Sequence, residues 1–183
     1  MEDTEIREVG VDKVAEEASE QGEVRASWLR WLALTTACFA VVAAIASMLA
    51  GRHANEALIA QTRASDQWSY YQAKGNKLAT RAAELEVLGA LHAPPEVTAK
   101  IGREIEKYGP EQEEIRKEAI GLEQESHASL HRHEWLAAIV TLLQVAMGLS
   151  AIAALISSRG IWLGATVAGV LAVTLFIWRV IAG

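Results

Sequence analysis

Three long runs of apolar residues divide the chain, because residues 31–50, 135–156 and 161–178 contain no Asp, Glu, Lys or Arg. A helix needs about 20 apolar residues to cross the roughly 30 Å hydrocarbon core of a bilayer. Each run meets or approaches that length, so we expect three transmembrane helices, over residues 28–51, 135–156 and 161–180. The first starts too late and runs too long to be a cleaved secretory signal.

Residues 52–134, between the first two spans, follow a heptad pattern. From Ala57 to Gly89, mostly small or apolar residues recur in alternating steps of four and three, which is typical of a helix packed along another helix. This row, called the seam below, contains Ala57, Gln61, Ala64, Trp68, Tyr71, Gly75, Leu78, Ala82, Leu85 and Gly89. Within it we expect Ala57, Ala64, Trp68, Tyr71, Gly75 and Leu78 to be the packing residues. A second row runs from Val97 towards the second span.

A helix break at residues 92–95 separates these two rows, because consecutive prolines remove backbone donors and restrict the residue before them. The two arms are each about 40 residues long, or about 60 Å as helices. The sequence therefore predicts an all-α membrane protein with three transmembrane helices and a long antiparallel coiled-coil hairpin between spans one and two. Gly109-Pro110 is expected to kink or break the second arm. Equal arms would place His53 opposite roughly His133 and Glu134.

Charge is concentrated in the first 30 residues, where nine acidic residues meet four basic ones, and the net charge of the chain is −6. Residues 1–27 hold few large apolar side chains, so we expect a mobile acidic tail. This balance lacks the basic footprint of a nucleic-acid-binding protein. The single Cys38 rules out a disulfide framework within one chain.

Tryptophans mark the ends of the predicted spans, where amphipathic rings favour the headgroup level. These membrane-interface candidates are Trp28, Trp31, Trp135, Trp162 and Trp178. Gln144 is the most polar residue near the middle of a span, and we expect it to hydrogen-bond to a neighbouring helix or subunit.

Histidines cluster near the membrane end of the predicted hairpin. His53, His127, His131 and His133 lie there, with Glu56 nearby. Two imidazoles four residues apart and a carboxylate are ligands that zinc accepts, so one interpretation of this cluster is a zinc site. The interpretation that we favour is a polar collar that satisfies hydrogen bonds near the headgroups. For the group from Asp66 to Lys74, which includes Trp68 and Tyr71, a packed core is favoured over a binding site.

Two stretches carry a resemblance to a known family: Ala54-Asn55-Glu56-Ala57-Leu58, and Ala64-Ser65-Asp66-Gln67-Trp68-Ser69-Tyr70-Tyr71-Gln72-Ala73-Lys74. They resemble the signature of a family of small bacterial membrane proteins known only as a domain of unknown function. The likeness extends to the acidic leader, the Gly-x-His end of the first span and two closing spans joined by a short turn. It implies a bacterial origin and, if that turn is cytoplasmic, a cytoplasmic amino terminus and a periplasmic hairpin.

No nucleophile elbow, phosphate-binding glycine loop or catalytic carboxylate pair is evident, so we expect no catalytic residues, no cofactor and no enzyme activity. The sequence favours a non-enzymatic structural or assembly protein of the bacterial inner membrane. Its partners would be the lipid bilayer and either further copies of itself or the subunits of a larger complex. The alternative is an oligomeric channel whose pore is lined by the spans.

Overall fold

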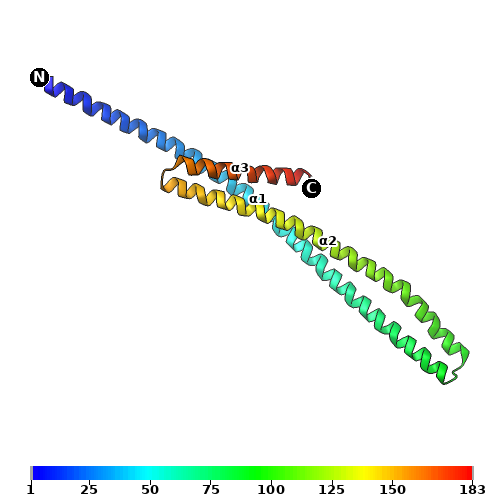
Figure 1. The fold of residues 1–183 in the computed structure, drawn as a ribbon. Helices are drawn as coiled ribbons and strands as arrows, with labels where there is room; N and C mark the ends of the chain where they lie inside the picture. Colours follow the sequence, from blue (N-terminus) through cyan, green and yellow to red (C-terminus); the bar gives the residue numbers. More distant parts are fainter. Residues whose placement is uncertain (1, 183) are drawn as a thin grey trace. The chain divides into compact units, whose positions relative to one another are not determined.

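The computed structural model describes the backbone of residues 2–182 and the side chains of residues 27–181. The described residues form three helices and no strand (Figure 1): α1 (Glu2–Ala90), α2 (Pro95–Leu155) and α3 (Arg159–Ala182). The all-helical fold predicted from the sequence is confirmed. Each helix contains a stretch that is long and apolar enough to cross a membrane, as expected of a multi-pass membrane protein.

Both connections between helices use the same local geometry. His92 and Ser157 have positive φ angles of 54° and 53°. At the end of α1, the Ala93 amide donates to the Leu88 carbonyl and the His92 amide donates to the Gly89 carbonyl. This pair of bonds defines a Schellman motif, in which a left-handed residue closes the helix. The backbone after Leu155, at the end of α2, forms the same pair of hydrogen bonds.

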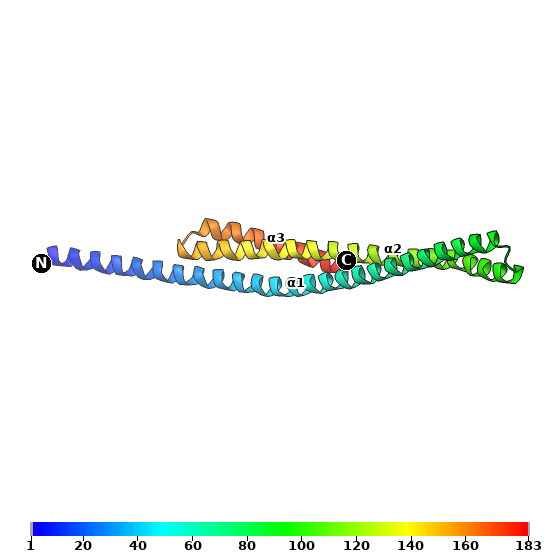
Figure 2. The same ribbon diagram turned by 90° about the horizontal axis from the view of Figure 1, so that it is seen from below.

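The chain divides into two compact units, and α1 and α2 contribute to both. In the unit Ala50–Glu134, the two arms lie side by side in both views (Figures 1 and 2). Ser126 contacts Ala57, whereas Glu104 contacts Arg81. Residue numbers therefore rise along α1 from 57 to 81 while those of the contacted residues on α2 fall from 126 to 104, so the two arms are antiparallel. The helix α2 passes Pro110 without ending, so of the two predicted outcomes the break does not occur, and a kink there stays a prediction.

The other unit contains the apolar parts of all three helices. One core cluster joins Phe39 of α1, Leu143 of α2 and Ala172 of α3. A second cluster joins Trp28 and Leu32 to Ala153. Burial of these side chains fixes which face of each helix points inward within this unit.

The acidic leader is part of α1, which begins at Glu2. The side chains of residues 2–26 lie outside the described part, as does the whole of residue 1. The mobility of this leader therefore stays a prediction.

Candidate functional site

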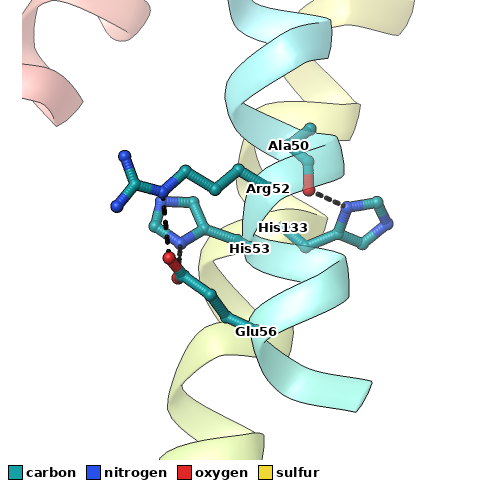
Figure 3. Close-up of polar contacts among 5 residues, drawn as sticks. All are labelled: Ala50, Arg52, His53, Glu56 and His133. Atoms are coloured by element: carbon teal, nitrogen blue, oxygen red, sulfur yellow. Dashed lines mark hydrogen bonds and ion pairs between the residues drawn. The ribbon is translucent and has the colours of Figure 1, made fainter. Parts of the chain in front are cut away.

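A small charged cluster lies near Ala50, at one end of the unit Ala50–Glu134. The Glu56 carboxylate accepts from Arg52 Nε at 3.0 Å, and His53 Nδ1 lies 2.9 Å from its other oxygen (Figure 3). All three residues are within one turn of α1, so this arrangement follows from i,i+3 and i,i+4 spacing. The hydrogen bond from Arg52, followed by that from His53, lowers the pKa of Glu56. The carboxylate is therefore ionised at neutral pH.

His133 has a different partner. Its Nδ1 lies 2.9 Å from the Ala50 carbonyl, on the opposite side of α1 from the Glu56 carboxylate (Figure 3). His131 lies 3.8 Å from Glu134 on its own helix, and His127 is exposed. No group of three or more His, Cys, Asp or Glu side chains in the described residues is placed to hold a metal ion. His53, His131 and His133 thus make polar contacts at separate places.

The register between the arms differs from the sequence-based expectation. Ala57 lies opposite Ser126 and Ala50 lies opposite His133. Position 53 therefore faces position 130, about one helical turn from the predicted partners His133 and Glu134. The prediction assumed that arms of equal length pair outwards from the tip, whereas the observed register brings small buried residues together.

Small residues are buried at the contact between the arms near Ala57. Ala57, Ala60 and Ala64 of α1 are buried, as are Ser126 and Ser129 of α2. The Ser126 hydroxyl donates to the Ala57 carbonyl at 2.9 Å, which satisfies a buried polar group.

The predicted seam is wrong at Gln61, Ala82 and Gly89, which are exposed, whereas Ala60, the neighbour of Gln61, is buried. Further along, Leu78 is half-buried. Gly75 is also half-buried, and a Cβ built on it would lie only 2.9 Å from Gln112 Nε2. A Cβ at this point would make the flexible end of the Gln112 side chain shift, so the position favours glycine without requiring it.

Trp68 takes part in a contact between the arms. Its indole Nε1 donates to Glu123 Oε1 at 2.9 Å. Its ring packs edge-on against Tyr71, with centroids 5.5 Å apart and an interplanar angle of 80°. Glu123 was not identified from the sequence, because its position in a Glu-rich stretch looks like an ordinary solvated helix face.

Lys74 is the centre of the other polar contact. Its Nζ donates to Glu111 Oε2 at 2.5 Å and lies 5.5 Å from the Tyr70 ring centroid and 5.3 Å from that of Tyr108. The hydrogen bond with Glu111 raises the pKa of Lys74 and lowers the pKa of Glu111. The charge of Lys74 is thus neutralised by Glu111 and flanked by aromatic faces, which attract cations. The sequence identified Lys74 and placed Tyr108 on the packing row of the second arm, but it indicated a solvated helix face for Glu111.

The tryptophans of the apolar unit differ in exposure. Trp28 is buried and packs edge-on against Trp162 at 6.4 Å, and Trp162 Nε1 lies 3.4 Å from Thr35 Oγ1. Trp31, Trp135 and Trp178 are exposed. Their assignment to the membrane interface stays a prediction.

Gln144 is exposed in the single chain, although its neighbour Leu143 is fully buried. Its amide therefore points away from the core of its own unit.

A family model described as "Domain of unknown function (DUF4337)" matches residues 28–182. Neither the curated proteins nor the solved structures yield a match to the chain.

Proposed function

The chain belongs to the DUF4337 family, a domain of unknown function, and we propose that it is a non-enzymatic membrane protein that mediates assembly. It acts either as a homo-oligomer or as an accessory subunit of a larger membrane complex. The polar and aromatic groups on the inner faces of the two arms are already used in contacts between the arms. A partner would therefore have to bind the outer, exposed faces, and the proposal rests on these.

In this proposal the unit Ala50–Glu134 is an antiparallel coiled-coil hairpin outside the bilayer. Contacts between the arms recur along its length, with Lys74 bonded to Glu111 and Arg81 3.1 Å from Glu104. Burial of small residues near Ala57 lets the arms approach closely. Such a hairpin is stiff enough to present a defined surface to a partner.

The observation that carries the proposal is an uncharged, exposed face on α1. Its residues recur in alternating steps of four and three, like a second heptad row, and each of them is exposed: Leu58, Thr62, Ser65, Ser69, Gln72, Asn76, Ala79 and Ala83. A row with this spacing is the geometry by which a helix packs against a further helix. The absence of charge in these eight residues lowers the desolvation cost of covering them.

The exposed side of α2 has the opposite character. Charged residues dominate it, among them Glu113, Glu114, Arg116, Lys117, Glu118 and Glu125, all of which are exposed. This surface is suited to water, since burying unpaired charges is costly. The contrast between the two arms favours α1 as the docking side.

We place the protein in the bacterial inner membrane, with the amino terminus in the cytoplasm and the hairpin in the periplasm. The three membrane-length helices support the membrane assignment. The orientation follows from placing the short turn before Arg159 on the cytoplasmic side, where positive charge is favoured.

The test is the mass of the complex after gentle extraction, with every co-purifying chain identified. The variant Ser69→Arg should lower the mass of the complex, because it buries a charge in the proposed docking face. Gln124→Arg, on the exposed side of α2, is the matched control and should leave the mass unchanged. A wild-type protein that extracts as a single chain without partners would contradict the proposal. A stable ring of identical chains that conducts ions in planar bilayers would favour the channel alternative.

A further inference from the structure

The second span carries an exposed amide near its midpoint. Gln144 lies nine residues after Trp135, or about 14 Å along the helix, close to the middle of a hydrocarbon core of roughly 30 Å. Leu143 and Ala146, on either side of it, are fully buried in the core of the unit. The burial of these neighbours fixes the rotation of α2 and leaves Gln144 on the outer face.

An amide at this depth needs a hydrogen-bond partner, because lipid chains offer none. Other polar side chains in α2 are satisfied by their own helix: Thr141 Oγ1 donates to the Ala137 carbonyl at 2.9 Å, and Ser150 Oγ donates to the Ala146 carbonyl at 2.9 Å. No hydrogen bond joins the Gln144 side chain to another described residue. The amide therefore has unused donors and acceptors on the exposed face of α2.

The residues around Gln144 leave room for a helix. Thr141, Gly148 and Ala151 are also exposed, and with Gln144 they recur in steps of three, four and three. A Cβ built on Gly148 would meet no atom within 4 Å. Small residues at such spacing let two helices approach closely enough for side-chain hydrogen bonds in lipid.

We propose that a second copy of this chain covers this face of α2, with the two Gln144 amides hydrogen-bonded to each other across a two-fold axis. An amide is both donor and acceptor, so it is complementary to itself. Copies with the same orientation in the membrane bring residue 144 to the same depth, and a two-fold axis pairs each residue with its counterpart. An unrelated subunit would need its own polar group at this depth. The inference depends on the homo-oligomeric form of the proposed function.

The test measures energy transfer between donor-labelled and acceptor-labelled full-length chains in liposomes, as the protein-to-lipid ratio is varied. Gln144→Leu should weaken self-association roughly tenfold, since it removes the hydrogen bonds but keeps the size of the side chain. Gln144→Asn retains the amide and should retain most of the association. Gly148→Leu should weaken association by blocking the close approach. Leu149 lies about 140° round the helix from Gln144. Leu149→Ala is therefore the control and should leave association unchanged.

The outcomes separate this inference from the proposed function. Self-association of the wild type that is unchanged by both Gln144→Leu and Gly148→Leu would overturn the assignment of this face and leave the assembly function standing. A wild type that stays monomeric at every ratio would overturn this inference. The proposed function would then depend on whether other chains co-purify.

Discussion

Gly169 shows how one residue controls helix packing in the apolar unit. It is buried on α3, and a Cβ built on it would lie 2.3 Å from two atoms of the Phe39 ring of α1. Phe39 is itself buried in the core cluster, so its ring has little freedom to move away. We expect Gly169→Ala to destabilise the protein by about 1–3 kcal/mol, the usual cost of overpacking.

The measurement is thermal unfolding of the purified protein in detergent. Gly164→Ala is the matched control, because a Cβ at Gly164 meets nothing within 4 Å, and its melting temperature should not fall. Equal melting temperatures for the two variants would contradict the packing of α3 against Phe39.

Glu111 makes the unit Ala50–Glu134 sensitive to acid. The hydrogen bond from Lys74 lowers the pKa of Glu111 below the ordinary value of 4.5. A carboxylate with a lowered folded-state pKa contributes stability that is complete above its unfolded value and is lost as the pH falls through its folded value. We therefore expect the wild-type helices to melt at a lower temperature in acid than at pH 7, as measured by circular dichroism. Glu111→Gln should melt lower at pH 7 and show a smaller further drop in acid.

The exposed Glu125 provides the control for this prediction. Glu125→Gln should keep the pH dependence of the wild type. The same dependence in Glu111→Gln would mean that the Lys74–Glu111 pair contributes nothing to acid sensitivity.

At the scale of the element, the face of α1 that contacts α2 is the sharpest difference between sequence and structure. Ala60 and Gln61 lie three and four residues after Ala57, so a heptad row can continue through either position. Alanine is only weakly hydrophobic, so the sequence does not show which of the two positions faces α2. In the structure Ala60 is buried and Gln61 is exposed. We expect Ala60→Leu to destabilise the paired arms by about 1–3 kcal/mol. Gln61→Leu should change stability by no more than about 0.5 kcal/mol.

Denaturation followed by circular dichroism distinguishes the two positions. A larger loss for Gln61→Leu than for Ala60→Leu would restore the heptad phase that the sequence suggested and would reject the observed contact.

The sequence predicted the elements better than the contacts between them. Charge-free runs of membrane length identified the three helices that are long and apolar enough to cross a membrane. Pro94 and Pro95 identified the end of the first long helix, because each feature depends on local chemistry. The register between the arms was displaced by about one turn, since pairing depends on which side chains fit together across the interface. Glu111 and Glu123 were missed for the same reason: nothing in a Glu-rich stretch indicates which carboxylate meets Lys74 or Trp68.

At the scale of the whole molecule, the three membrane crossings that we propose would put the proposed hairpin and the short turn between α2 and α3 on opposite sides of the bilayer. In a Cys38→Ser background, which removes the one native thiol, we expect Ala99→Cys to react with a membrane-impermeant maleimide in intact spheroplasts. Ser157→Cys should react only after lysis. Both positions are exposed in the structure.

The reverse pattern would overturn the proposed periplasmic location of the hairpin but keep α2 as a span. Reaction of both cysteines from the same side would contradict the crossing by α2 itself, and with it the bilayer depth on which the pairing of Gln144 depends.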